Sequence, residues 1–177
     1  MYKGYVIEPI DRRTIDKAYP LAKLVAPDLP QLEWREFCQS CEPSTVQRNV
    51  GEGERIVVVL NAKRYVKGLG IYAIRNHATY GRLVDVPLLL TASAADGEGV
   101  AAALVGFVIS KCDDLACSGI RFWATNSDTW AHRLEPDRIA RSDHGVFMPA
   151  HASAVEIKNA LCAQVLEGAE AIDRLSR

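Results

Sequence analysis

The chain has 177 residues, 49% of them apolar and 24% charged, which is the composition of a globular protein with one well-buried core. Its formal net charge is −1 and its isoelectric point lies near 6.4, which excludes a broad basic surface for nucleic acid or anionic lipid. No apolar run approaches the roughly 18–20 residues that a membrane-spanning helix needs. The first residues, MYKGYVIEPIDRR, lack the apolar segment of a signal peptide, so we expect a cytoplasmic protein.

The five cysteines do not predict a disulfide framework, because their number is odd and their spacing is irregular. Cys38 and Cys41 form a Cys-x-x-Cys pair, but no second close pair and no histidine pair completes a zinc site. We therefore expect reduced, structural thiols and no bound metal ion.

The first quarter of the chain predicts one strand followed by two helices. Tyr5–Pro9 alternates in character as a strand does, and Thr14 is the expected N-cap of the helix that follows. That helix carries an apolar face as far as Leu24 and ends before Pro27. A second, shorter helix is predicted from Leu32 to about Cys41.

Three strands joined by short polar connections come next, and they predict an antiparallel meander. They are expected at Arg55–Asn61, Gly68–Asn76 and Arg82–Thr91, which are rich in β-branched residues or alternate between apolar and polar ones. Pro87 has no N–H to donate to a ladder, so it marks an edge or a bulge near the end of the third strand.

Beyond the meander the hydrophobic period changes from two residues to that of a helix. Apolar side chains fall on one helical face from Gly99 to Leu115, and Ile120–Ala124 predicts a buried strand with Phe122 and Trp123 in the core. A short helix at Thr129–Leu134, a strand at Gly145–Met148 and a long amphipathic helix at Ala152–Leu175 complete the expected elements. The last helix has enough apolar surface to cover the sheet or to pair with a second copy as a homodimer. The whole pattern predicts a single α/β domain over residues 1–177, with an α+β mixed sheet.

A small, glycine-bearing loop is expected between the third strand and the long helix, within residues 88–105 (LLLTASAADGEGVAAALV). Where a strand is followed by such a loop and then a helix, the free N–H groups at the start of the helix point toward the loop. They form a site for an anion. Gly97, Gly99 and Ala102 match the dinucleotide fingerprint G-x-G-x-x-G/A, but that fingerprint belongs at the start of a βαβ unit. Because three antiparallel strands come first, a Rossmann site is not the favoured interpretation.

The order of strand, two helices, three-strand meander, loop, helix and strand resembles the GNAT superfamily of acyl-CoA-dependent N-acyltransferases. The resemblance covers roughly residues 5–148 in the order of elements, and in sequence it rests on residues 96–105 and on Asn126. It implies a GNAT-like fold, in which helices flank a central sheet, and a site for acetyl-CoA or another acyl-CoA as co-substrate.

The resemblance also implies which residues hold the coenzyme. The splayed end of the third strand would pair with the pantetheine arm, the glycine loop would hold the pyrophosphate, and Asn126 matches a position that contacts the cofactor or orders the site. The residues so implied are Leu89, Leu90, Thr91, Asp96, Gly97, Glu98, Gly99, Val100, Ala101 and Asn126. Asp96 stands where the family has Arg or Gln, and Arg133 stands where many members have the tyrosine that protonates the departing thiolate.

Asp85 and Tyr80 are the expected catalytic residues. Asp85 lies in mid-strand, on the same face as Leu83 and Leu89 by strand alternation, near where family members place an acidic base for the acceptor amine. Its ordinary alternative is a solvent-facing or salt-bridged aspartate, with Arg82 as the partner. Tyr80 lies at a hairpin turn, where an acceptor could reach it.

The leading function is transfer of an acyl group from acetyl-CoA, or a longer acyl-CoA, to a small amine, a peptide N-terminus or a lysine. The amine would attack directly in a ternary complex. The alternative is a non-catalytic GNAT-fold module for ligand sensing or partner binding, which Asp96 and the missing tyrosine favour. Gly97, Gly99, Ala101 and the bulge-like Pro87 favour the enzyme. Neither a nucleic acid nor a membrane is an expected partner.

Overall fold

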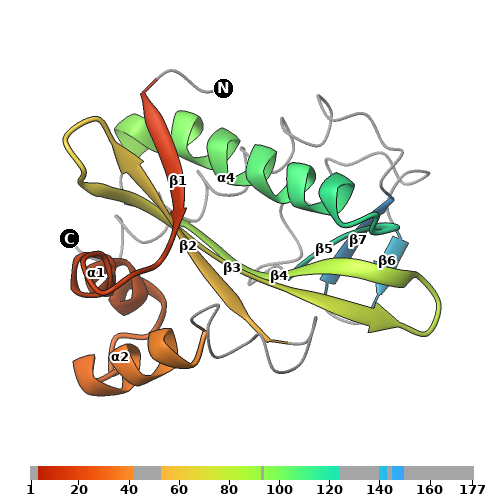
Figure 1. Ribbon diagram of the computed structural model, residues 1–177, viewed down its shortest axis with the longest axis horizontal. Coiled ribbons are helices and arrows are strands. Elements are labelled where there is room, and N and C mark those ends of the chain that lie inside the picture. Colours follow the sequence, from red (N-terminus) through yellow and green to blue (C-terminus); the bar gives the residue numbers. More distant parts are fainter. Residues whose placement is uncertain (1–3, 42–52, 93, 124–139, 143–144, 150–177) are drawn as a thin grey trace.

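The computed structural model describes residues 4–41, 53–92, 94–123, 140–142 and 145–149, which form a sheet with helices on both faces (Figure 1). In these ranges seven strands make one sheet in the order β1-β2-β3-β4-β5-β7-β6. The strands are β1 (Tyr5–Pro9), β2 (Arg55–Asn61), β3 (Val66–His77), β4 (Gly81–Thr91), β5 (Gly119–Trp123), β6 (Ala140–Ser142) and β7 (Gly145–Pro149), and the helices are α1 (Ile15–Val25), α2 (Gln31–Ser40) and α4 (Ala94–Asp114). Neighbouring strands are antiparallel except for β4 and β5, which run parallel.

The elements predicted in the described ranges are confirmed in kind and order, and the mixed sheet is confirmed with them. The bounds of β1 and β2 are those predicted, whereas β3 and β4 are longer at their hairpin ends and β6 was not predicted. A strand of three residues is too short to show an alternating pattern. The predicted elements at 129–134 and 152–175 lie outside the described residues. Within those residues no helix combines the length and the hydropathy that crossing a membrane requires.

Two hydrophobic cores lie on the two faces of the sheet. Helix α4 covers one face, and α1 and α2 cover the other (Figure 1). The core under α4 includes Val57, Val59, Tyr72, Val84, Val86, Val100, Leu104 and Val108. The core under α1 and α2 includes Ile15, Leu21, Trp34, Val58, Leu60, Leu69, Ile71 and Leu90.

A β-bulge interrupts the pairing of β3 with β4. Two residues of β4, Val86 and Pro87, lie opposite the single residue Tyr72 of β3, because the register shifts by one between the pairs on either side. The bulge predicted at Pro87 is thus confirmed. A proline suits this place because it has no N–H that the interrupted ladder would leave unpaired.

The bulge changes which face each β4 side chain occupies. Val86 packs under α4, whereas Leu88, two residues further, packs toward α1 and α2. Leu89 accordingly lies against α4, while Asp85, which alternates with Val86, lies on the α1 and α2 face. The prediction that Asp85 and Leu89 share a face is therefore wrong, since alternation does not continue through a bulge.

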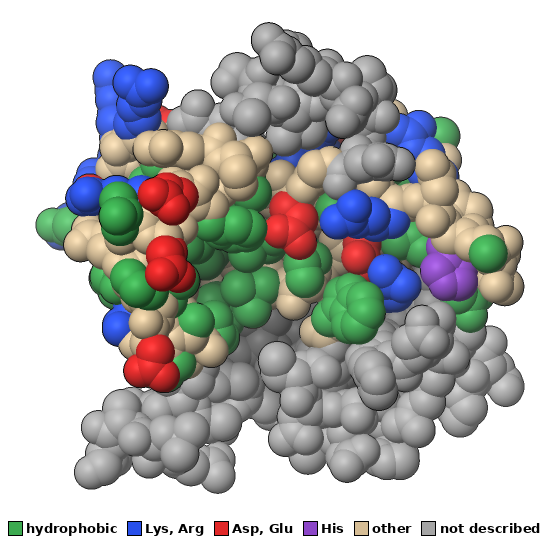
Figure 2. Space-filling view, turned by 90° about the horizontal axis from the view of Figure 1, so that it is seen from below, with side chains coloured by type: hydrophobic (Ala, Val, Ile, Leu, Met, Phe, Trp, Pro, Cys, Tyr) green, Lys and Arg blue, Asp and Glu red, His purple; other side chains and the backbone are tan. Residues whose placement is uncertain are grey.

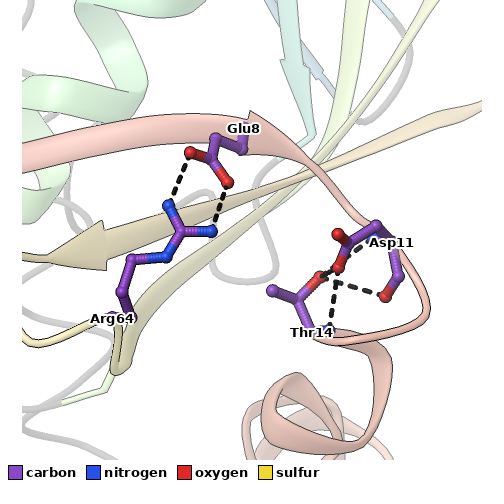
Figure 3. A network of polar contacts seen from close by, with 4 residues as sticks. All are labelled: Glu8, Asp11, Thr14 and Arg64. Atoms are coloured by element: carbon purple, nitrogen blue, oxygen red, sulfur yellow. Dashed lines mark hydrogen bonds and ion pairs between the residues drawn. The ribbon is translucent and has the colours of Figure 1, made fainter.

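Helix α1 is preceded by a capping network around Asp11 rather than by a Thr14 side-chain cap (Figure 3). Asp11 Oδ1 accepts hydrogen bonds from the backbone N–H groups of Arg13 and Thr14, each at 3.0 Å. The Thr14 hydroxyl donates to the same oxygen at 2.7 Å and accepts from the Asp11 N–H at 2.9 Å. Thr14 has backbone angles in the helical region, so it does not take the extended conformation of an N-cap residue.

Replacing Asp11 by Ala should lower the free energy of unfolding by about 1 kcal/mol, because two backbone N–H groups lose their acceptor. The hydrogen bond from Thr14 holds the pKa of Asp11 below its usual value. The stabilisation is therefore complete above about pH 4 and is lost as the pH falls through the lowered pKa. Urea unfolding of both proteins at neutral and acid pH measures this difference. Asp11→Asn keeps an acceptor oxygen and is the control; an equal loss at neutral pH in both variants would contradict the capping role.

Candidate functional site

The end of β4 carries a run of backbone that only one neighbouring strand covers. β5 pairs with β4 only as far as Val86↔Phe122, whereas β3 follows β4 to Thr91. Among the described residues, the segment 87–91 therefore has a partner strand on its β3 side alone. Its remaining N–H and C=O groups have the arrangement of a sheet edge, which an extended ligand can pair with.

Helix α4 begins at Ala94, directly beyond this segment, and not at Gly99 as predicted, so the prediction that Asp96, Gly97 and Glu98 lie in a loop is wrong. Alanine has the highest helix propensity, and the cost of about 1 kcal/mol for each helical glycine can be offset by packing. The N–H groups without an intrahelical partner are those of the first turn, around residues 94–96. The amides of Glu98, Gly99, Val100 and Ala101 instead fall within the hydrogen-bond ladder of the helix.

Gly99 packs closely against Tyr5 of β1. A Cβ built on Gly99 would lie 3.1 Å from Cε2 of Tyr5, so the tyrosine ring occupies the side on which another residue would carry its side chain. Gly97 is buried and Glu98 is exposed. These surroundings give Gly99 a packing role, and they place the Glu98 carboxylate toward solvent.

Three consecutive residues at the end of β4 differ in their surroundings. Leu89 packs against Ala101 and Ala102 of α4, whereas Leu90 is buried on the opposite face of the sheet. Thr91 is 5% exposed, and its Oγ1 has no hydrogen-bond partner within the described residues. The junction of β4 and α4 thus contains a buried hydroxyl without a hydrogen bond to any described residue, which costs about 1–3 kcal/mol of stability.

Asp85 is held by two side chains of β5. Asp85 Oδ1 accepts a hydrogen bond from Arg121 Nε at 2.7 Å and another from Trp123 Nε1 at 2.8 Å. The side chains of Asp85 and Arg121 are 11% and 13% exposed. The alternative of a salt-bridged aspartate is thus confirmed, but the partner is Arg121 and not Arg82. Figure 2 looks onto this face of the sheet and shows acidic and basic side chains next to an apolar area.

Tyr80 does not lie with Asp85. It precedes β4 at the β3–β4 turn, where its ring stacks on His77 with centroids 4.8 Å apart, and its carbonyl accepts a hydrogen bond from the Ser118 hydroxyl. It lies five positions before Asp85 in the sequence, which corresponds to about 17 Å along an extended strand. Its catalytic role stays a prediction, as does the role of Asn126, which lies outside the described residues.

The sequence analysis missed Arg121 and Trp123 as site residues. Phe122 is buried as predicted, but Trp123 is 38% exposed, so its assignment to the core is wrong. Strand alternation gave one usable signal, since it places Arg121 and Trp123 on a common face. Strand alternation does not predict the parallel pairing of β4 with β5, and that pairing places Arg121 opposite Asp85.

The described cysteines are free and buried, as expected for structural thiols. Burial raises the pKa of Cys38 to about 12 and that of Cys112 to about 11, so neither is a thiolate nucleophile near neutral pH. Within the described ranges, no group of three or more His, Cys, Asp or Glu side chains lies together as a metal site would require.

Comparison with known proteins finds structures of similar fold but no match by sequence. No family model and no curated protein matches the chain. Among solved structures, a chimera of spermidine N-acetyltransferase from Vibrio cholerae and hSSAT is 15% identical, with a TM-score of 0.61, and the match covers 84% of this chain and 96% of that one.

Two aminoglycoside-acetyltransferase structures are also similar. AAC(6')-Ih, an aminoglycoside 6'-N-acetyltransferase from Acinetobacter baumannii, is 15% identical over 79% of this chain and 97% of its own, with a TM-score of 0.58. AAC(6')-Iy, in complex with the bisubstrate analogue CoA-S-monomethyl-acetylneamine, is 13% identical over 78% and 97%, also with a TM-score of 0.58. At such identities the likeness establishes the fold, and the chain has the GNAT fold.

Gly68→Ala should lower the free energy of unfolding by about 1–3 kcal/mol, and by more than Gly70→Ala. A Cβ at Gly68 would lie 2.5 Å from Cγ1 of Val100 in α4 and 3.1 Å from a backbone oxygen, whereas the three nearest atoms at Gly70 are side-chain ends at 3.2 Å. A β-branched valine cannot easily turn away, so α4 must move. Denaturant unfolding followed by circular dichroism measures both variants. Equal losses, or a larger loss at Gly70, would show that α4 does not sit this close to β3.

Proposed function

We propose that this protein transfers an acyl group from acetyl-CoA, or another acyl-CoA, to an amine by direct attack in a ternary complex. The observation that carries the proposal is the half-paired end of β4, which leads directly to the N-terminus of α4. A strand edge suits the amide-bearing pantetheine arm, and a helix N-terminus suits the pyrophosphate. The complex of AAC(6')-Iy with an analogue that contains CoA supports the same class of co-substrate.

The residues of this junction have defined tasks in the proposal. The backbone at Leu89, Leu90 and Thr91 pairs with the pantetheine arm, and the buried Thr91 hydroxyl adds a donor and an acceptor beside it. The free amides of the first turn of α4 bind phosphate oxygens, with Asp96 in that turn and Gly97 at its end. Val100 and Ala101 are buried and pack against the sheet, so they fix the position of that turn, as Gly99 does through Tyr5.

Asp85 is the proposed acceptor of the amine proton. The amine nitrogen forms a bond to the thioester carbonyl carbon, the C–S bond breaks, and CoA leaves as the thiolate. A carboxylate can receive the proton that the nitrogen loses. Water or another group protonates the thiolate, since the position of the tyrosine that many GNAT members use is Arg133 here.

The acceptor is proposed as a small amine, a peptide N-terminus or a lysine. The similar structures named above are a spermidine N-acetyltransferase and aminoglycoside acetyltransferases, whose acceptors are amines. We place the reaction in the cytoplasm, as expected from the sequence. A homodimer stays a prediction, because the helix expected to form it lies outside the described residues.

A ligand-binding module without catalysis is the second candidate, and Asp96 is the observation that favours it. Asp96 is the third residue of α4, where an acidic residue interacts favourably with the helix N-terminus and so competes with a bound anion. The two candidates differ in one measurable respect, which is whether acetyl-CoA that binds is also turned over.

Calorimetric titration should show acetyl-CoA binding with a Kd on the order of micromolar. Asp96→Arg should tighten it about threefold to thirtyfold, because each unit of charge at a helix N-terminus contributes about 0.3–1 kcal/mol. Asp113→Arg is the matched control, since it makes the same charge change at the other end of α4 and should leave the Kd unchanged. Absence of heat at millimolar acetyl-CoA in both the unaltered protein and Asp96→Arg would overturn the proposed site.

Asp85→Asn should lower kcat by about 10²–10⁴-fold, because an amide cannot take the amine proton. Release of CoA is followed with a chromogenic thiol reagent, with spermidine, an aminoglycoside and a lysine-containing peptide as acceptors. Asp113→Asn removes an exposed carboxylate from the surface of α4 and should leave the rate unchanged. An undiminished rate in Asp85→Asn would remove Asp85 from the mechanism.

A further inference from the structure

Both described hydrogen bonds to the Asp85 carboxylate fall on the same oxygen. Arg121 Nε and Trp123 Nε1 donate to Oδ1, and no hydrogen bond to Oδ2 is present within the described residues. A carboxylate held in this way has one oxygen fixed by two donors, and the plane of the group is fixed with it. The second oxygen keeps its capacity to accept a proton or a hydrogen bond.

The two donors are themselves fixed by the sheet. Arg121 is directly opposite Asp85 in the parallel ladder, and Trp123 lies two residues further along the same face of β5. The Arg121 guanidinium lies 4.8 Å from the centre of the Trp123 ring, so a cation–π contact links the donors to each other. The three side chains therefore hold one another, and all three are carried by strands of the sheet.

Trp123 occupies the point at which β4 and β5 part. The last pair between these strands is Val86↔Phe122, so Trp123 is the first β5 residue beyond it. Trp123 as a residue is 38% exposed, although its indole N–H donates a hydrogen bond to Asp85. Beyond Val86, where β4 no longer pairs with β5, residues 87–91 of β4 begin the proposed acyl-CoA site.

We propose that Trp123 and Arg121 are positioning residues, which hold Asp85 so that Oδ2 receives the proton of the acceptor amine. This inference rests on the acyl transfer proposed above and adds two residues to it. As the nitrogen bonds to the acyl carbon and the C–S bond breaks, the N–H proton passes to Oδ2 while Oδ1 keeps both hydrogen bonds. Neither Trp123 nor Arg121 exchanges a proton with the substrate.

A double-mutant cycle tests whether Trp123 acts through Asp85. Trp123→Phe removes the N–H donor and keeps an aromatic ring, and it should lower kcat about tenfold to hundredfold. The KM for acetyl-CoA should change less than about twofold, because the backbone of β4 and α4 is untouched. In the Asp85→Asn background, Trp123→Phe should lower kcat no further, since the proton acceptor that it positions is already lost. The substrates are acetyl-CoA and whichever of spermidine, the aminoglycoside and the lysine-containing peptide gives the highest turnover.

Two further variants separate positioning from folding. Arg121→Lys keeps the charge but loses the Nε donor, so it should also lower kcat without raising the KM for acetyl-CoA. Arg64→Gln breaks the exposed ion pair with Glu8, whose shortest contact is 2.6 Å, and should leave both constants unchanged (Figure 3). Thermal unfolding is measured for every variant, and Arg121→Lys carries the test if Trp123→Phe does not fold.

The outcomes distinguish this inference from the function on which it rests. If the unaltered protein transfers the acyl group but Trp123→Phe leaves kcat unchanged, or its effect multiplies with that of Asp85→Asn, the inference is overturned and the function stands. If the unaltered protein neither binds nor turns over acetyl-CoA, the function fails and the inference falls with it. A loss of kcat that disappears in the Asp85→Asn background supports both.

Discussion

The β-bulge at Val86 and Pro87 is the constraint on which the two halves of the site depend. Before the bulge, alternation turns Asp85 away from α4 and toward the sheet face that α1 and α2 share. After it, the alternation is reversed, and Leu89 contacts α4. The pairing with β5 ends at the same place, with Val86. A single extra residue thus separates a charged cluster on one face from a half-paired strand end that leads to a helix N-terminus.

The position of α4 is set by the absence of side chains beneath and beside it. Gly68 and Gly70 on β3 lie under Val100 and Leu104, where a Cβ would meet atoms at 2.5 and 3.2 Å. Gly99 on the helix itself meets the Tyr5 ring of β1 in the same way. Close packing of this kind restricts how far the first turns of a helix can shift. The N-terminus of α4 is therefore held next to the end of β4 by contacts that need no ligand.

Local sequence patterns predicted most of the described fold and only part of the candidate site. Alternation and a proline located the strands and the bulge, because both signals act over a few residues. The start of α4 was misplaced because a glycine such as Gly97 usually indicates a loop, whereas here it is a buried residue inside the helix. Arg121 was missed because 36 residues separate it from Asp85, and only the parallel ladder joins them. No local pattern encodes such a pairing.

The carboxylate of Asp96 does not by itself decide between an enzyme and a binding module. A charge in the first turn of a helix contributes about 0.3–1 kcal/mol, and about 2 kcal/mol in the most favourable partly buried sites. Micromolar affinity corresponds to about 8 kcal/mol, so one adverse charge weakens binding by at most about thirtyfold and does not abolish it. In the proposed site the remaining binding energy comes from the backbone of β4 and the amides of α4, which do not depend on the identity of residue 96. The decisive property is therefore whether the strand end and the first turn are accessible together, rather than the sign of one side chain.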